Sequence, residues 1–597
     1  MRLVGLLLIM RFLEHPPPFV FFTGKGGVGK TSVACATAVA LAGQGKRVLL
    51  ISTDPASNVG QVFDVVIGNT ITPIAAVPGL SALEIDPEEA AEAYRERIIG
   101  PVRGLLPDKE LASITEQLSG SCTIEIASFN EFTSFLADPA LYGGYDHVLF
   151  DTAPTGHTVR LLQLPGSWTD FLQAGKGDAS CLGPLAGLDK QRATYAEAVA
   201  ALKDPTRTRP VLVARAQTSS LQEIERTYAE LGQIGIHATH VVINGLLPPE
   251  AGSEPLAGAI RERESAALDA MPAGVAALAR DVIALRPTNM VGLPALVSLF
   301  SDEAFDAAEG ARAASLAVAI PGPLVALVDE IEKDKHGLVL CMGKGGVGKT
   351  TIAAAIAVEL AHRGHAVHLT TTDPAAHLQE TLHGAVTGLR VSRIDPAAAT
   401  QDYRDRVMAT KGKNLDEAGR RNLAEDLLSP CTEEVAVFQQ FSRAVHESRH
   451  EFVIVDTAPT GHTLLLLDAA GAYHRDVVRQ MGETMGYTTP LMRLQDPRQT
   501  KTVLVTLAEP TPVTEAEVLQ DDLARAGIHP WAWVINNSLL AARPESPFLR
   551  VRADNEAAQI ARVEALSDRV AIVPLMSEEP VGVERLRAIL TDEVVLT

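Results

Sequence analysis

Two things that the chain lacks narrow its function: an excess of basic residues and any long apolar run. Its 597 residues include 52 lysines and arginines and 73 aspartates and glutamates, which gives a net charge of −21. This balance gives a nucleic-acid partner no electrostatic support. The apolar run Leu3–Met10 is far shorter than the about 20 residues that a membrane-spanning helix needs, and no small-residue cleavage site follows it.

These absences lead to two expectations about the ends and surroundings of the chain. Residues 1–18 are expected to form a disordered N-terminal extension, with translation beginning upstream of Met10. The protein is expected to be cytoplasmic and to reach the inner membrane only through a partner.

Cysteine is also scarce, with five in the chain. Cys35 falls in an alanine-rich helical run and Cys341 in an apolar strand, so both are expected to be packing residues of the core. Cys122, Cys181 and Cys431 are widely separated, and separated cysteines do not define a site by spacing alone. Three thiolates are also too few for a closed, four-coordinate zinc site.

What the chain has is a phosphate-binding loop in duplicate. GKGGVGKT occurs at Gly24–Thr31 and at Gly343–Thr350, each time between an apolar strand and an alanine-rich helical run. In such a loop the backbone N–H groups and the helix N-terminus bind phosphate, the last lysine reaches the outer phosphates, and the threonine hydroxyl binds Mg²⁺. The residues predicted to bind nucleotide in this way are Gly24, Gly26, Gly27, Val28, Gly29, Lys30, Thr31, Ser32, Gly343, Gly345, Gly346, Val347, Gly348, Lys349, Thr350 and Thr351.

The duplication extends far beyond the loops. RVLLISTDPAS matches HAVHLTTTDPAA, VLFDTAPTGHT matches VIVDTAPTGHT, and VVINGLL matches WVINNSLL, in the same order in both halves. The offset falls from 319 residues between Lys30 and Lys349 to 292 between Asn244 and Asn536, so the second half has shorter connections. A period this long indicates a domain duplication. The predicted domains are an N-terminal extension at 1–18, a first P-loop ATPase domain at 19–308, a linker at 309–323 and a second P-loop ATPase domain at 324–597.

Each half alternates apolar strands with amphipathic helices. This alternation predicts an α/β fold with two homologous P-loop NTPase domains in tandem, each a mostly parallel sheet with helices on both faces. Ligands of such sheets bind beyond the carboxyl ends of the strands, where the repeated motifs fall.

Two pairs of aspartates follow predicted strands. Asp151 and Asp456 end apolar strands, where a carboxylate can hold a water on Mg²⁺. Asp54 and Asp373 follow the second strand of each half, where they could orient the attacking water or contact the Mg²⁺ shell. Turn initiation is the alternative for an Asp-Pro in this position.

Each loop also carries an early lysine, Lys25 or Lys344, and each half has a later strand-end asparagine, Asn244 or Asn536, which we expect to contact adenine. The early lysine resembles that of the deviant Walker A ATPases, which include the partition, septum-site and nitrogenase-iron-protein ATPases. In that group it acts on the nucleotide of the other subunit. The resemblance implies that the two halves act as a pair within one chain, with the early lysines among the catalytic residues.

Two of the three remaining cysteines are related by the duplication. Cys122 and Cys431 occupy equivalent positions, each in a polar turn before a helix, where the helix N-terminus favours thiolate. Cys181 has no cysteine counterpart. Three soft thiolates suit a trigonal ion such as trivalent arsenic or antimony, and His157 and His462 could serve as neighbouring ligands or as hydrogen-bonding groups.

From about Met10 to its end, the chain resembles the two-domain ATPase of arsenical efflux pumps. The resemblance is carried by both GKGGVGKT loops and by SGSCTIEIASF, ASCLGP, SPCTEEVAVFQ and the two DTAPTGHT segments. It implies that Cys122, Cys181 and Cys431 bind As(III) or Sb(III) between the halves, with His157, His462 and Ser429 nearby. It also implies metalloid-stimulated ATP hydrolysis that drives a separate arsenite channel. A metalloid chaperone is a further implied partner, and the chain is expected to be a monomer.

Three other classes are alternatives. A targeting ATPase for tail-anchored membrane proteins usually has a CxxC zinc pair and a methionine-rich insertion; this chain has no such pair and only ten methionines. An iron–sulfur reductase would leave the third thiol unexplained. A partition or septum-positioning ATPase should lack the cysteine triad.

Overall fold

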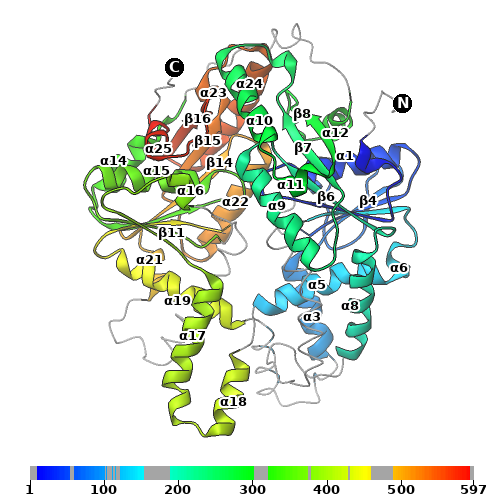
Figure 1. The fold of residues 1–597 in the computed structure, drawn as a ribbon, viewed down its shortest axis with the longest axis horizontal. Coiled ribbons are helices and arrows are strands. Elements are labelled where there is room, and N and C mark those ends of the chain that lie inside the picture. Colours follow the sequence, from blue (N-terminus) through cyan, green and yellow to red (C-terminus); the bar gives the residue numbers. More distant parts are fainter. Residues whose placement is uncertain are drawn as a thin grey trace. The chain divides into compact units, whose positions relative to one another are not determined.

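Two parallel sheets organise the chain (Figure 1). The computed structural model describes residues 10–53, 59–100, 103, 111, 115, 118, 121–152, 188–301, 320–373, 378–427, 431–458 and 489–591. Contacts divide the chain into two compact units. The first unit comprises Met1–Pro249 and Arg261–Phe305, and the second comprises Glu250–Ile260 and Asp306–Thr597.

The first unit has an eight-stranded sheet in the order β3-β4-β2-β5-β1-β6-β7-β8, parallel except for the pair β3–β4. Its strands are β1 Phe19–Thr23, β2 Val48–Ser52, β3 Thr72–Pro73, β4 Leu80–Glu84, β5 His147–Asp151, β6 Thr208–Ala214, β7 His240–Leu246 and β8 Ala279–Ala284. Its helices are η1 Arg11–Leu13, α1 Lys30–Gly43, α2 Val59–Phe63, α3 Pro87–Ile99, α5 Ser121–Ala137, α6 Pro139–Tyr142, α8 Leu188–Lys203, α9 Thr218–Gln233, α11 Ala273–Ala276 and α12 Leu293–Leu299. The division of the chain falls within η4 Pro249–Ala251 and within α10 Pro255–Asp269, so each of these has residues in both units.

The second unit has an eight-stranded, all-parallel sheet in the order β12-β11-β13-β10-β14-β15-β16-β9. Its seven strands from β12 to β16 repeat the order of β4 to β8 in the first unit, but it has no counterpart of β3 among the described residues and adds β9 at the opposite edge. Its strands are β9 Gly322–Pro323, β10 Gly337–Met342, β11 Val367–Thr371, β12 Leu389–Arg393, β13 Phe452–Asp456, β14 Thr500–Leu507, β15 Ala532–Ser538 and β16 Val570–Pro574. Its helices are α14 Leu324–Glu332, α15 Lys349–His362, α16 Leu378–Leu382, α17 Pro396–Thr410, η5 Gly412–Asn414, α18 Glu417–Asp426, α19 Cys431–Glu447, α21 Pro490–Leu494, α22 Pro510–Arg525, α23 Leu539–Ala542, α24 Pro547–Leu566 and α25 Val583–Ala588. The predicted tandem of mostly parallel α/β sheets is confirmed.

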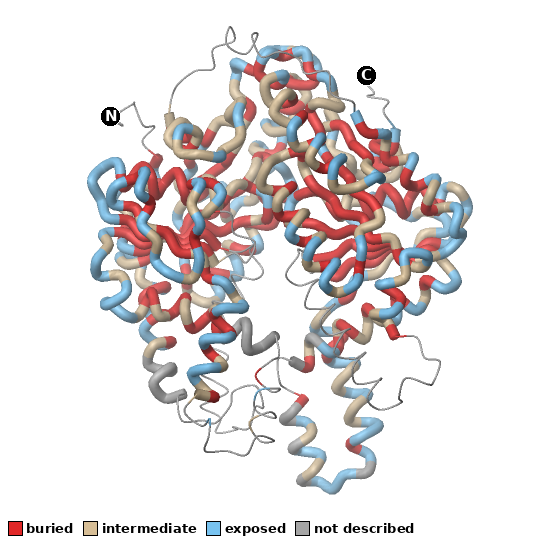
Figure 2. Tube along the Cα trace, turned by 180° about the vertical axis from the view of Figure 1, so that it is seen from behind, coloured by how far each residue is buried: buried red, intermediate tan, exposed pale blue. Residues whose placement is uncertain are grey.

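Helices cover both faces of each sheet, and the central strands, which are mostly apolar, are therefore buried along almost their whole length. In β1, Val20 and Phe22 pack with α1 on one face, whereas Phe19 and Phe21 pack with α5 and α9 on the other. Figure 2 shows the resulting continuous burial along the strands of both units. In α1 the small side chains of its alanine-rich run let the helix lie close to the sheet, and most of it is buried.

The expectation of disorder at the start of the chain is wrong for residues 10–18. Phe12 is fully buried, with its ring edge-on to that of Phe22 at 5.9 Å between centroids. The backbone N–H groups of Arg11 and Phe12 donate to the Asp281 carboxylate at 2.8 and 3.1 Å. An apolar side chain and a buried acceptor thus fix this segment to the first unit, a long-range pairing that local composition does not reveal.

The linker prediction needs one correction at its end. Gly322–Pro323 forms β9, which pairs with β16 in the sheet of the second unit. The other predicted domain limits stay predictions. Among the described residues, no helix has both the length and the apolarity to cross a membrane.

The sequence Ile-Asp-Pro occurs once in each unit, at Ile85–Pro87 and at Ile394–Pro396, and each time it starts a helix. The Asp86 carboxylate accepts from the backbone N–H groups of Glu88 and Glu89 at 2.8 and 2.9 Å, and that of Asp395 accepts from Ala398 at 3.1 Å. Proline follows each aspartate at the first helical position, where its missing N–H leaves no bond unmade. The motif is therefore a helix cap.

Replacing Asp395 with alanine should lower the free energy of unfolding of the second unit by about 1 kcal/mol, because the first turn of α17 loses its side-chain acceptor. Urea unfolding followed by circular dichroism measures the change. Asp402→Ala, at an exposed position within the same helix, is the control and should change stability by less than about 0.5 kcal/mol. Equal losses in the two variants would contradict the capping role.

Candidate nucleotide-binding sites

A glycine with a left-handed backbone precedes the helix in each phosphate loop. Gly29 has φ 89° and Gly348 has φ 92°. A Cβ atom at Gly29 would lie 2.2 Å from Nδ2 of Asn244, and one at Gly348 would lie 2.1 Å from Nδ2 of Asn536. Both the backbone conformation and the close approach of the amide therefore require glycine.

The asparagine amides hold the loops in place. Nδ2 of Asn244, in β7, donates to the Val28 carbonyl at 2.8 Å, and Nδ2 of Asn536, in β15, donates to the Val347 carbonyl at 2.9 Å. Both asparagines are buried. The sequence does not predict this contact. The equivalent positions of the two asparagines in the repeat are its only indication that they share a role. Their predicted contact with adenine stays a prediction.

The last lysine of each loop folds back over its own loop. Nζ of Lys30 donates to the Lys25 carbonyl at 3.2 Å, and Nζ of Lys349 donates to the Lys344 carbonyl at 2.8 Å. Each of these two lysines is 6% exposed. A buried ammonium beside the loop amides gives each site the positive charge that a phosphate group needs.

The first lysines contact carboxylates of their own unit. Nζ of Lys25 lies 4.0 Å from Oε2 of Glu223, and Nζ of Lys344 forms an ion pair with Oε1 of Glu515. Sequence reasoning did not single out these glutamates.

A threonine hydroxyl and a buried aspartate meet behind each loop. Oγ1 of Thr31 donates to Oδ2 of Asp151 at 2.6 Å, and Oγ1 of Thr350 donates to Oδ2 of Asp456 at 2.8 Å. Both aspartates end their strands, β5 and β13, as the sequence predicts, and both are fully buried. In each unit the structure thus places a hydroxyl and a carboxylate, the hard oxygen ligands that Mg²⁺ prefers, beside the phosphate loop.

In the second unit the structure describes further contacts of the strand-end aspartate, Asp456. The Thr371 hydroxyl also donates to Oδ2 of Asp456, at 3.1 Å, while Oδ1 of Asp456 is buried without a hydrogen-bond partner among the described residues. Burial, helped by the charge of Asp373, raises the pKa of Asp456 to about 6, although Lys349 and the hydrogen bonds from Thr350 and Thr371 lower it. Such a carboxylate oxygen, buried and without a donor, fits a magnesium-bound water.

Of the two aspartates predicted to follow the second strand of each half, the structure describes Asp373 but not Asp54. Asp373 follows β11, is half-buried, and its backbone N–H donates to the Thr371 hydroxyl at 3.0 Å. The structure therefore brings Lys349, Thr350, Asp456 and Asp373 together in one site. Asp54, its equivalent in the first unit, lies outside the described residues.

The predicted metalloid ligands are only partly described. Cys122 is the second residue of α5 and Cys431 the first of α19, so both backbones lie in the first turn of a helix and not in the turn before it. Their side chains, together with Cys181, His157, His462 and Ser429, lie outside the described residues. Cys35 and Cys341 are buried free thiols, and burial raises the pKa of each, as suits core residues.

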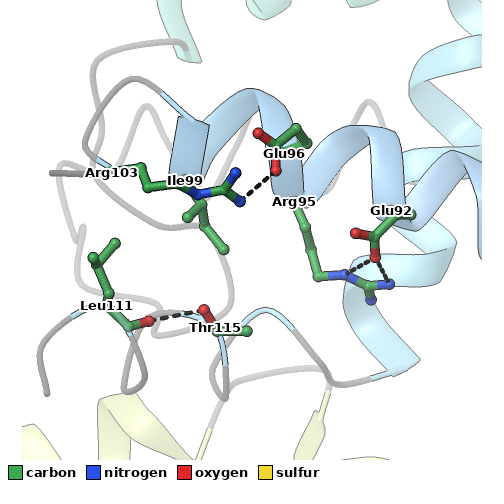
Figure 3. A pocket seen from close by; sticks show the side chains of 7 residues that line it. All are labelled: Glu92, Arg95, Glu96, Ile99, Arg103, Leu111 and Thr115. Atoms are coloured by element: carbon green, nitrogen blue, oxygen red, sulfur yellow. Dashed lines mark hydrogen bonds and ion pairs between the residues drawn. The ribbon is translucent and has the colours of Figure 1, made fainter. Parts of the chain in front are cut away.

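A hollow of about 250 Å³ lies beside α3 and is lined by neither a phosphate loop nor a cysteine (Figure 3). Its two arginines are paired with glutamates: Arg95 with Glu92 and Arg103 with Glu96, each at 2.6 Å. Its lining is Glu92, Arg95, Glu96, Ile99, Arg103, Leu111 and Thr115. We assign it no function.

Gly348→Ala should weaken binding of a fluorescent ATP analogue at least tenfold, because the added Cβ would displace either the loop or the Asn536 amide. The matched control is Gly364→Ala, where φ is 91° and nothing lies within 4 Å of the added Cβ. Both variants carry a backbone strain of about 1–2 kcal/mol, so only the clash distinguishes them. Comparable binding by the two variants in an equilibrium titration would contradict the assignment.

Comparison with known proteins agrees with this geometry. The family model of anion-transporting ATPases matches residues 18–302, 336–494 and 472–592. An arsenical pump-driving ATPase of Acidiphilium multivorum is 58% identical over 596 residues, covering 98% of this chain and 100% of that protein. One from Escherichia coli is 59% identical over 580 residues, covering 97% of this chain and 99% of that protein. The ATPase GET3 of Eremothecium gossypii is 33% identical over 259 residues, covering 40% of this chain and 74% of that protein.

The family model matches both phosphate loops and most of the chain, and the relatives match it over almost its whole length. The chain is therefore an ATPase, and it belongs to the anion-transporting ATPase family.

Proposed function

We propose that this ATPase couples ATP hydrolysis in its two halves to the export of trivalent arsenic or antimony through a separate membrane channel. The observation that carries the proposal is the near-full-length match with proteins named arsenical pump-driving ATPases. The paired loops, each with a buried lysine and a threonine–aspartate pair, support hydrolysis at two sites.

The residues around each loop have different roles in ATP hydrolysis. Lys30 and Lys349 bind the outer phosphates and oppose their charge. Thr31 with Asp151, and Thr350 with Asp456, would hold Mg²⁺, which when bound neutralises charge on the phosphates.

The remaining nucleotide contacts come from residues whose roles rest on sequence. Asp54 and Asp373 orient the attacking water or contact the Mg²⁺ shell, and Asn244 and Asn536 contact adenine. Lys25 and Lys344 act on the nucleotide of the other half and stabilise charge in the transition state.

The activating ligand is the metalloid, which is also the transported substrate. Cys122, Cys181 and Cys431 bind it between the halves, with His157, His462 and Ser429 nearby. The position of Cys122 and Cys431 at equivalent helix N-termini supports this set, because a helix N-terminus lowers the pKa of a thiol and favours the thiolate that a metalloid needs.

The proposal includes the location, the oligomeric state and the partners of the protein. The protein is a cytoplasmic monomer that joins the inner membrane through the channel subunit and receives metalloid from a chaperone. The targeting of tail-anchored proteins is the alternative. It is favoured less because the chain has no CxxC pair and because its near-full-length relatives are named arsenical pump-driving ATPases.

Cys122→Ser, Cys181→Ser and Cys431→Ser should each raise the antimonite concentration needed for activation while leaving the unstimulated ATPase rate near that of the wild type. The thiols bind the activator, and the phosphate loops are untouched. Coupling between two sites is typically about 1–3 kcal/mol, so wild-type stimulation should be roughly five- to a hundredfold. The measurement is ATPase rate during an antimonite titration.

Cys35→Ala is the control, because it removes a buried thiol that lies outside the proposed set. It should activate at the wild-type concentration. If the three serine variants also activate there, the metalloid assignment fails.

A further inference from the structure

The first lysine of each phosphate loop is held by a carboxylate of its own unit. Lys344 forms an ion pair with Glu515, whose side chain is 7% exposed. Lys25 lies 4.0 Å from Glu223, whose side chain is 10% exposed, and 3.5 Å from the Ser219 hydroxyl. Nζ of each lysine therefore lies beside a largely buried carboxylate within its unit.

The two glutamates are equivalent positions of the repeat. Glu223 lies in α9, which follows β6, and Glu515 lies in α22, which follows β14. Their offset of 292 residues equals that between Asn244 and Asn536. The lysine–glutamate pair is therefore part of the duplicated domain structure and occurs once in each unit.

Burial of the glutamate side chain strengthens its attraction for the lysine. A carboxylate removed from water is strongly destabilising unless a cation or hydrogen-bond donors compensate it, so it binds a nearby ammonium tightly. A lysine held in this way cannot reach a nucleotide elsewhere at the same time. Releasing it requires a competing anion, and the phosphates of ATP are the strongest that this reaction supplies.

We propose that Glu223 and Glu515 are positioning residues that restrain Lys25 and Lys344 in the resting enzyme and release them during turnover. The inference rests on the proposed function, which has these lysines act on the nucleotide of the other half. The glutamates do not touch substrate; they act through the lysines and set the rate without metalloid.

The two restraints are unequal. Glu515 contacts its lysine directly, whereas Glu223 lies at the limit of an ion pair and shares Lys25 with Ser219. Loss of Glu515 should therefore have the larger effect.

Glu515→Gln should raise kcat without metalloid by about fivefold, with KM for ATP within about twofold of the wild type, because the freed lysine acts in the transition state. The metalloid-stimulated rate should stay within about twofold of the wild-type rate, so the stimulation ratio falls. Glu223→Gln should show the same change at smaller size. Glu515→Asp keeps the charge and should restore a low rate without metalloid.

Matched controls remove a charge from the same helices. Asp521→Asn in α22 and Glu230→Gln in α9 replace exposed carboxylates and should leave both rates unchanged. An unchanged basal rate in Glu515→Gln, or the loss of both rates, would overturn the proposal. If Glu515→Gln does not fold, Glu223→Gln decides by the same criteria.

Lys344→Ala separates this inference from the proposed function. If it keeps the full stimulated rate, Lys344 has no role in trans, and that part of the proposed function fails together with the restraint. If it loses the stimulated rate while Glu515→Gln behaves as the wild type, only the restraint fails.

Discussion

The hydrogen bond from an asparagine amide to the phosphate loop is the contact on which each site depends. The amide occupies the space where a side chain would stand at Gly29 or Gly348, and it fixes the loop to β7 in the first unit and to β15 in the second. With the loop fixed, the helix after it begins at the lysine, and the next residue places its hydroxyl on the strand-end aspartate. One conformational constraint thus positions lysine, threonine and aspartate together.

The sites concentrate buried charge, and each charge has a partner in this structure. The last lysine bonds to a backbone carbonyl, the aspartate accepts from threonine, and the first lysine pairs with glutamate. Buried charges are strongly destabilising when left without partners, so a nucleotide that binds these lysines would take the place of their present partners. Oδ1 of Asp456, in contrast, has no hydrogen-bond partner to give up among the described residues. The exchange of partners at the lysines gives a physical reason for the nucleotide state to control the conformation of residues around the loop.

The sequence predicts the fold and the loops well, because the phosphate motif and the strand-end aspartates are local patterns repeated in the same order. It fails where a residue acts through a distant partner. Phe12 lies in a short apolar stretch whose partners, Phe22 and Asp281, cannot be read locally. Glu223 and Glu515 occur on amphipathic helices, where a glutamate is usually a surface residue. The cysteine set rests on symmetry and resemblance, because those side chains lie outside the described residues.

We propose that the two halves form one coupled ATPase. The decisive measurement is the turnover of Lys30→Ala and Lys349→Ala, each determined separately with saturating ATP and antimonite. Loss of one phosphate-binding lysine typically raises the barrier by several kcal/mol in that site. If the halves are coupled, either change alone abolishes most of the activity of the whole chain. Retention of more than about half of the wild-type rate by either variant would show that the sites work independently and would contradict the proposal.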